Sequence, residues 1–288
     1  MTGARVAIVT GASSGIGEAC AARFAERGLR VYGASRNPNF RPERFRPLLM
    51  DVTSTDSVAR AVEEVARREN RIDVVVNGAG FGLAGSIEDT SLDEAVKQFE
   101  TNFFGVFRVC RAVLPRMRQQ RDGLIINIGS LGGLFSLPFQ GFYSASKFAL
   151  EGLSESLRQE VYAFGIRVVL LEPGDVLSRF TENRVLAAGA SAQSAYEPVF
   201  RKALEIIESD ERHGSSPESV AAVASKLIGL RRPRVRYALG RIDQRMALAL
   251  KKLIPSKYFS RVVMSHYGLL SPHDRASAAS SNEPPRAA

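Results

Sequence analysis

The stretch that decides the fold is Arg5-Val-Ala-Ile-Val-Thr10, followed by Gly11-Ala-Ser-Ser-Gly15-Ile-Gly17 and by Glu18-Ala-Cys-Ala-Ala-Arg-Phe-Ala-Glu-Arg27. The apolar run, the glycine-rich turn and the helical pattern predict a strand, a tight turn and a helix. Glycine allows the turn and lets a phosphate approach the backbone, while the unpaired N–H groups at a helix start attract an anion. The segment therefore predicts a dinucleotide site.

A glycine turn alone is also common for purely geometric reasons. Two further features favour phosphate binding, because Gly28 suits the end of the helix and residues 29–35 supply a second strand pattern. Strand and helix patterns then alternate along the chain, which predicts an α/β fold: a doubly wound (Rossmann), mostly parallel seven-stranded sheet with helices on both faces. The expected strands are residues 5–10, 30–35, 48–51, 72–77, 124–130, 166–172 and 235–240.

A candidate for proton transfer is Tyr143-Ser144-Ala145-Ser146-Lys147, whose tyrosine and lysine are one helical turn apart. A nearby positive charge lowers the pKa of a phenol from about 10, which would make Tyr143 a usable general acid or base. Such a pair is also frequent at surfaces with no chemistry. Ser130 favours function, because it ends the apolar run 123–130, and the carboxyl ends of parallel strands border ligand sites.

These segments and three further motifs follow one another along residues 4–240. Thr10-Gly-Ala-Ser-Ser-Gly-Ile-Gly17, Asn77-Gly-Ala-Gly80, Asn102, Ser130, Tyr143-Ser-Ala-Ser-Lys147 and Pro173-Gly174 together resemble the motif set of the short-chain dehydrogenases/reductases. Two positions depart from it, since Gly78 stands where the family often has Asn, and Ser178 where it usually has Thr. Gly78 affects the turn after the fourth predicted strand, and Ser178 affects one hydroxyl contact to the cofactor.

The resemblance implies a role for each catalytic candidate. Tyr143 would exchange the proton of the substrate oxygen, Ser130 would hydrogen-bond that oxygen, Lys147 would bind the nicotinamide ribose and lower the tyrosine's pKa, and Asn102 would hold a relay water. Without the resemblance, Asn102 would be an ordinary residue inside the helical pattern 92–118. The expected cofactor-binding residues are Gly11, Ser13, Ser14, Gly15, Ile16, Gly17, Ser35, Arg36, Asp51, Val52, Asn77, Gly78, Ala79, Tyr143, Lys147, Pro173, Gly174, Val176 and Ser178.

The charge at the end of the second strand indicates which nicotinamide is used. An acidic residue there would bind the ribose 2′-hydroxyl and repel a 2′-phosphate, whereas this chain has Ser35-Arg36-Asn37. A planar, permanently charged guanidinium suits phosphate, so we expect NADP(H). Alternatively, Arg36 is one of many solvated arginines. Asp51-Val52 resembles the family's adenine contact, although a turn aspartate would look the same.

The segments expected beside the nicotinamide are apolar: residues 131–139 and 176–200. They favour a hydrophobic carbonyl or alcohol as substrate, unless Phe135, Leu137 and Phe139 simply pack a loop onto the core. The small residues near the middle of 174–200 are typical of a mobile lid. Within the family, the chain looks most like the hydroxysteroid and retinol dehydrogenases. The expected activity is an NADP-dependent carbonyl reductase of the EC 1.1.1 type.

The formal net charge is +9, and residues 231–261 contain ten Lys or Arg with Asp243 as their only acid. Met246, Leu250, Leu253 and Ile254 recur there at helical spacing, so we expect a basic amphipathic segment at about 241–267. Its apolar side could close the pocket, or it could dock on anionic lipid as a peripheral membrane contact. Sparse aromatics in this region argue against nucleic-acid binding.

The remaining sequence features concern the domain organisation, the cellular compartment and metal binding. We expect one domain over 1–270, a disordered tail at 271–288, and a homodimer or homotetramer. Cys20 and Cys110 lie in helical patterns and indicate small core residues in a reducing compartment. The three scattered histidines lack ligand spacing, so no metal is expected, and the absence of a signal-peptide pattern favours the cytoplasm. A catalytically inactive dinucleotide-binding regulator or scaffold is the alternative function.

Overall fold

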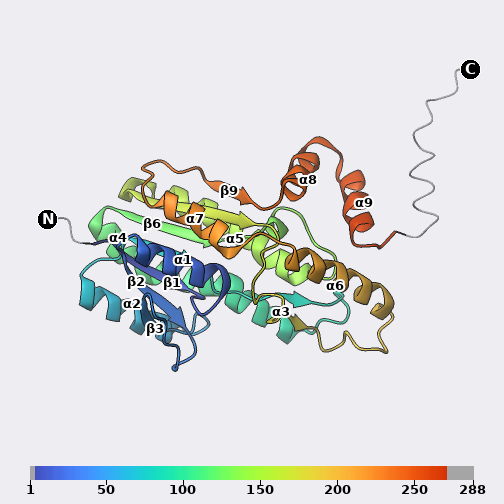
Figure 1. The fold of residues 1–288 in the computed structure, drawn as a ribbon, viewed down its shortest axis with the longest axis horizontal. Coiled ribbons are helices and arrows are strands. Elements are labelled where there is room, and N and C mark those ends of the chain that lie inside the picture. Colours follow the sequence, from blue (N-terminus) through green and yellow to red (C-terminus); the bar gives the residue numbers. More distant parts are fainter. Residues whose placement is uncertain (1–3, 271–288) are drawn as a thin grey trace, which may run out of the picture.

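The computed structural model describes residues 4–270 and places seven strands in one parallel sheet (Figure 1). The strands are β1 (Val6–Thr10), β2 (Arg30–Ser35), β3 (Arg46–Leu49), β4 (Val74–Asn77), β6 (Gly123–Ile128), β7 (Ile166–Pro173) and β9 (Arg236–Leu239), in the order β3-β2-β1-β4-β6-β7-β9. Every pairing is parallel. The predicted seven-stranded Rossmann fold is confirmed, with strand ends shifted by up to two residues.

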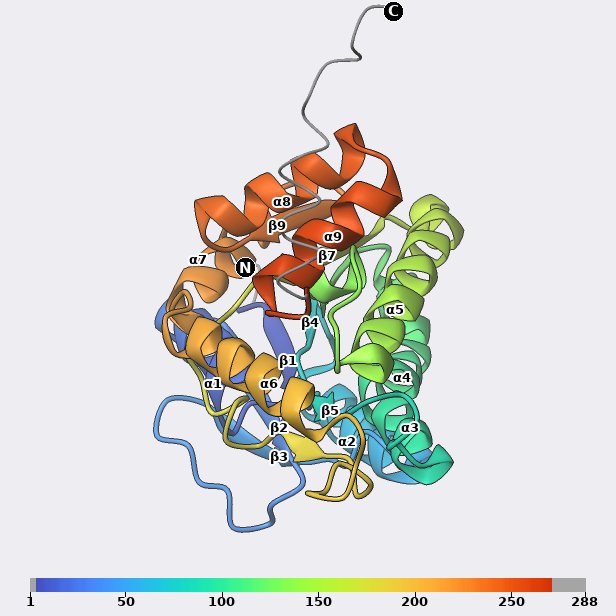
Figure 2. The same cartoon turned by 90° about the vertical axis from the view of Figure 1, so that its right-hand side faces the viewer.

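Helices cover both faces of the sheet and produce two separate apolar cores. On one face, α1 (Gly15–Glu26) packs with α7 (Pro217–Leu227), and on the other lie α2 (Thr55–Glu69), α4 (Gly105–Gln120) and α5 (Gly141–Glu160). Figure 2 shows α1 and α7 on one side of the sheet and α4 and α5 on the other. The strands are buried from both sides, which explains their uninterrupted Val, Ile and Leu runs.

The strand order reverses between β1 and β4, because the chain proceeds outward to β3 on one side and to β9 on the other. Ligands of open α/β sheets bind at such a reversal, outside the carboxyl ends of the strands. The elements at this end are α3 (Leu92–Phe99), α6 (Glu197–Arg212), α8 (Ile242–Leu253) and α9 (Ser256–His266).

Three local features differ from the expectation. The helical pattern 92–118 is interrupted by a π-helical turn, Glu100–Phe104, between α3 and α4. Two short strands, β5 (Leu83–Ala84) and β8 (Val185–Leu186), pair in parallel, and their length is too small for a periodicity signal. Short 3-10 turns occupy Leu131–Gly133 and Tyr162–Phe164.

Both cysteines are buried free thiols, as predicted. Burial raises the pKa of each thiol to about 12, so neither is reactive at neutral pH. Within residues 4–270, no helix has the length and hydrophobicity needed to cross a bilayer, and no three histidine, cysteine or carboxylate side chains are grouped as metal ligands would be. The predicted disorder of residues 271–288 lies outside the described residues.

Candidate active site

A large cleft lies at the carboxyl ends of β1, β4, β6 and β7. Its volume is about 1520 Å³, which exceeds the ~300–1,000 Å³ of a pocket for one drug-sized ligand. The cleft therefore has room for a dinucleotide and a second molecule beside it.

The glycine turn forms one wall of the cleft and fits a pyrophosphate. Gly11 and Gly15 have φ of +69° and +58°, and a Cβ at Gly17 would lie only 2.3 Å from the Gly11 carbonyl oxygen. Ser14, at the start of α1, makes no side-chain capping hydrogen bond, so the first N–H groups of that helix remain available to an anion.

Gly78 belongs to the same close packing and explains one departure from the family motif. A Cβ at Gly78 would lie 2.9 Å from the Thr10 carbonyl oxygen, and one at Gly11 would lie 2.7 Å from the Gly78 carbonyl oxygen. The Gly78 N–H donates to Thr10 Oγ1 at 3.0 Å. The turns after β1 and β4 thus touch backbone to backbone, which leaves no room for an asparagine side chain at Gly78.

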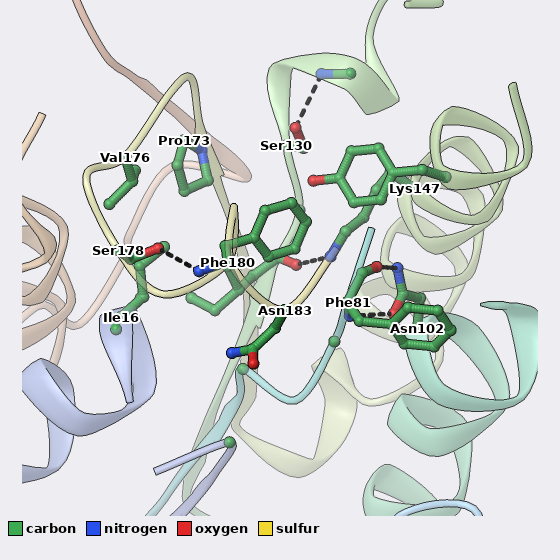
Figure 3. A pocket seen from close by; sticks show the side chains of 18 of the residues that line it. Ile16, Phe81, Asn102, Ser130, Lys147, Pro173, Val176, Ser178, Phe180 and Asn183 are labelled. Carbon is green, nitrogen blue, oxygen red and sulfur yellow. Dashed lines mark hydrogen bonds between the residues drawn. The ribbon is translucent and has the colours of Figure 1, made fainter. Parts of the chain in front are cut away.

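Tyr143, Lys147 and Ser130 line one wall of the cleft. Figure 3 shows Lys147 and Ser130 there. Tyr143 and Lys147 project from the first two turns of α5, and Ser130 follows β6. Lys147 Nζ donates to the Ile128 carbonyl at 2.8 Å and lies 5.9 Å from the centroid of the Tyr143 ring. Ser130 Oγ accepts from the Gly132 N–H at 3.0 Å, which leaves its own proton free to point into the cleft.

The pKa of the tyrosine differs from the expectation. Burial raises the pKa of Tyr143 to about 12, Glu211 and Asp175 act in the same direction, and the Ser130 hydroxyl and Arg184 oppose the rise. Lys147 is not among the groups that oppose this rise, and its ammonium donates to the Ile128 carbonyl. Burial lowers the pKa of Lys147 to about 8. At neutral pH the Tyr143 phenol is therefore protonated.

Asn102 lies in the π-helical turn between α3 and α4, and 1% of it is exposed. Its amide donates to the Phe81 carbonyl at 3.1 Å and accepts from the Phe81 N–H at 3.1 Å, so it holds the loop after β4 (Figure 3). The extra residue in a π-turn reorients the side chain, and such turns occur frequently at functional sites. This turn brings Asn102 to the cleft, where the helical pattern alone would not place it.

Most of the predicted cofactor residues line the cleft. Ser178 also lies against the glycine turn, 3.3 Å from where a Cβ of Gly15 would be. Asn77 is the exception, since its buried amide donates to Asn127 Oδ1 at 2.8 Å beneath the cleft.

Arg36 and Asp51, both predicted to bind the cofactor, differ in their surroundings. Arg36 is exposed at the rim and has no hydrogen-bond or ion-pair partner within residues 4–270. Asp51 accepts from the Thr53 N–H at 2.9 Å and from its hydroxyl at 2.8 Å, so its carboxylate stabilises a turn while also bordering the cleft.

The other end of the cleft is more polar than the sequence suggested. Phe135 and Leu137 line it, but Phe139 turns away and packs on Phe200, 5.4 Å between ring centroids. Phe180 packs against the Tyr143 ring, with 5.7 Å between the two ring centroids.

Three carboxylates that the sequence analysis missed, Asp175, Asp210 and Glu211, border the same space. Burial and the two neighbouring carboxylates raise the pKa of Asp175 to about 6. Asp210 contacts His266 Nε2 at 2.7 Å, and Glu211 pairs with Arg184. Asp175 directly follows Pro173-Gly174 and could have been found from that motif. Asp210 and Glu211 end helix α6 and carry no such signal.

Part of the predicted lid, residues 174–200, lines the cleft, and the segment is attached to β5, to the residues that follow it and to α3. Strand β8 pairs with β5, the Ala188 N–H donates to Glu94 Oε1 at 2.8 Å, and Tyr196 Oη donates to Glu88 at 2.8 Å. These contacts hold the segment beside the cleft, where Phe180 packs on Tyr143.

Comparison with known proteins supports the same conclusion as the site. The short chain dehydrogenase family model matches residues 5–188. A 3-ketodihydrosphingosine reductase of Bacteroides thetaiotaomicron is 40% identical over 92% of this chain and 98% of its own. An NADPH-dependent 3-dehydrocapnine reductase of Ornithobacterium rhinotracheale is 29% identical over 90% of this chain and 95% of its own. A short-chain dehydrogenase of Streptomyces avermitilis has a crystal structure that covers 98% of this chain and 100% of its own, with a TM-score of 0.77 at 29% identity.

A Rossmann sheet with a glycine turn and a Ser-Tyr-Lys group in one cleft defines a nicotinamide-dependent oxidoreductase. The chain belongs to the short-chain dehydrogenase/reductase family.

Proposed function

We propose that the protein reduces the ketone of a long-chain lipid with NADPH. The observation that carries this proposal is the convergence of Ser130, Tyr143 and Lys147 on one wall of a cleft with room for a dinucleotide and a substrate. In this proposal the bound nicotinamide supplies the hydride, and the protein orients both molecules and moves the proton.

The proposed roles follow from the positions of the side chains. Tyr143 donates its proton to the substrate oxygen, because its pKa of about 12 keeps the phenol protonated at neutral pH. Ser130 donates a hydrogen bond to the same oxygen, and Lys147 holds the ribose beside it. Asn102 orients a water in the path by which Tyr143 regains its proton. Phe180 and the lid exclude bulk water.

The choice of NADPH is supported by Arg36. Its guanidinium has no partner within the described residues 4–270 and stands at the rim where the second strand ends, and no carboxylate occupies that position. A charge-assisted contact from arginine favours a 2′-phosphate. The Ornithobacterium relative, whose name specifies NADPH, agrees with this choice.

For the substrate, we propose a 3-keto amino lipid of the 3-ketodihydrosphingosine type, in line with the Bacteroides relative. Such a molecule combines a long alkyl chain, a ketone and a neighbouring ammonium. The cleft offers matching chemistry: Phe259 and Val263 provide apolar surface, Asp175 provides negative charge near Tyr143, and Asp210 lies close to Asp175 in the same cleft. Steroids and retinoids have no ammonium to match these carboxylates.

The test compares kcat/KM for NADPH oxidation with 3-ketodihydrosphingosine, with a ketone of the same chain length that lacks the amine, and with steroid and retinoid carbonyls. We expect the amino ketone to be preferred by about tenfold or more, since hydrogen bonds to charged groups contribute ~1.5–3 kcal/mol. Asp175→Asn should reduce that preference, and Asp56→Asn, the same change at an exposed site on α2, should not. Equal activity on the amine-free ketone would refute the amino-lipid assignment.

We also propose that the protein is a homodimer or homotetramer. Phe104 and Phe107 are 41% and 43% exposed near the start of α4, and two aromatic side chains so close together favour burial against another subunit. Sedimentation velocity should give a mass of at least two chains, and Phe107→Glu should lower it.

A further inference from the structure

The two helices that follow β9 extend past the sheet and lie side by side at one end of the molecule (Figures 1 and 2). Helix α8 has an unusual orientation, because its apolar side faces solvent. Ile242, Met246 and Leu253 are 75%, 65% and 80% exposed, and Ala249 is exposed between them. Spacings of four, three and four residues place these four side chains on one face, which we term the outer stripe.

The opposite face of α8 accounts for this orientation. Gln244 donates to Asp175, Ala247 lines the cleft, and Lys251 donates to the Leu134 carbonyl. These contacts hold a mixed face of the helix, which also carries the half-buried Leu248, toward the body of the protein. The apolar side therefore does not close the pocket, which corrects one alternative of the sequence analysis for Met246 and Leu253.

Basic side chains lie beside the outer stripe on α8, at Arg245 and Lys252, and at the start of α9, at Lys257. Arg245, Lys252 and Lys257 are exposed, and the one acid of the segment, Asp243, is already paired with Arg241 at 2.6 Å. The surface is thus apolar with a positive border. A symmetric pairing of two such surfaces would bring like charges together, which disfavours a second copy of the chain as the occupant. An anionic bilayer satisfies both the apolar and the positive components.

The same helices form part of the cleft. Phe259, Val262 and Val263 of α9 line it, and Phe259 packs on Phe135 at 5.6 Å between ring centroids. A lipid that leaves the bilayer at α8 and α9 would enter the cleft over apolar side chains. This link between docking and substrate entry rests on the proposed function.

We propose that the outer stripe of α8 lies in the interface of an anionic membrane, with Arg245, Lys252 and Lys257 at the headgroups. Helix α8 then lies parallel to the surface and does not span it. The protein adsorbs reversibly, and the membrane side of the cleft receives the substrate.

The experiment is co-sedimentation of the full chain with vesicles of phosphatidylglycerol or of phosphatidylcholine, at about 0.1 M salt, where the screening length is about 10 Å. Binding to phosphatidylglycerol should exceed binding to phosphatidylcholine. Changing Arg245, Lys252 and Lys257 together to Glu should weaken the partition about a hundredfold, because each basic group contributes about fivefold near an anionic surface and reversal adds repulsion. Met246→Ser with Leu253→Ser should weaken it about tenfold or more.

The matched control reverses three other arginines, Arg231, Arg232 and Arg234, and so makes the same change in net charge. These exposed residues lie at the opposite end of the sheet, near the contacts of Ile228 and Leu230 with Arg5 and Arg167. The control should bind vesicles within about threefold of the unmodified chain. An equal loss in the control would show that net charge alone drives adsorption and would overturn the proposal, as would equal partition into both vesicle types.

A dimer formed through the outer stripe would give a different experimental result. If Leu253→Ser converted a dimer into a monomer in sedimentation velocity while vesicle binding stayed unchanged, the outer stripe would be a subunit interface and the proposal would fail. Vesicle binding is measured without cofactor or substrate, so it remains informative even if the protein reduces no amino ketone. Conversely, the triple Glu variant should retain its activity on a short soluble ketone, since its three positions do not line the cleft.

Discussion

Tyr143→Phe removes one oxygen atom from the site and leaves the rest of it in place. The ring stays buried and keeps its contact with Phe180, so the free energy of unfolding should fall by about 1 kcal/mol or less, the cost of one hydrogen bond. Lys147 remains bound to the Ile128 carbonyl, which does not involve the tyrosine hydroxyl. Any large loss of turnover therefore reports on the missing proton.

The size of that loss follows from the state of the phenol. With a pKa of about 12, roughly one phenol in 10⁴ to 10⁵ is ionised near pH 7.5, so nearly every molecule carries the proton that ketone reduction needs. Removing a positioned acid costs about 10² to 10⁴ in rate. Ser130 keeps its hydroxyl and can still donate a hydrogen bond, which favours a residual rate above the uncatalysed one.

The assay is single-turnover NADPH oxidation with any accepted ketone, together with NADPH binding by fluorescence titration. Tyr143→Phe should lower the rate at least a hundredfold and leave the dissociation constant for NADPH within about threefold. Tyr162→Phe is the matched control, because Tyr162 is 78% exposed and lies outside the cleft. A Tyr143→Phe variant that turns over within tenfold of the unmodified protein would refute the assignment of the proton donor.

Three further outcomes are expected. Arg36→Asp should shift the ratio of kcat/KM from NADPH toward NADH by about tenfold or more, and an unmodified protein that already prefers NADH would contradict the assignment. Gly17→Ala should lower the free energy of unfolding, measured in urea without cofactor, by about 1–3 kcal/mol, because its methyl group would overlap the Gly11 carbonyl; an unchanged midpoint would show that the turn relaxes at no cost. Burial and the neighbouring Glu151 raise the pKa of Glu172 to about 8, so its contribution to stability is present below about pH 4.5 and is lost as the pH rises through 8. Glu172→Gln removes that loss, so its free energy of unfolding, measured in urea, should rise relative to that of the unmodified protein between pH 6 and pH 9. Parallel curves of the free energy of unfolding against pH would contradict the raised pKa.

The sequence by itself determined the sheet and one side of the cleft. Parallel strands buried on both faces require continuous apolar runs, and a phosphate turn requires glycine where a Cβ would collide, as at Gly17. Both constraints act within a few residues, so they are visible locally. The same holds for Tyr143 and Lys147, whose spacing is one helical turn, and for Ser130 at the end of an apolar run.

Only the tertiary structure decided what surrounds these residues. The pairing of β5 with β8 joins segments about a hundred residues apart and leaves no periodic signal in either. Asp175 and Glu211 face Tyr143 from different elements, and together with burial they raise the pKa that Lys147 was expected to lower.

Helix α8 shows most clearly what the sequence alone could not determine. Its sequence specifies an apolar and a polar side, but the contact of Gln244 with Asp175 turns a mixed face inward and leaves the outer stripe exposed. Amphipathic spacing fixes which side chains share a face. Which face is buried depends on partners distant in sequence, because burial and charge are set by everything packed within a few ångströms, whatever its position in the chain.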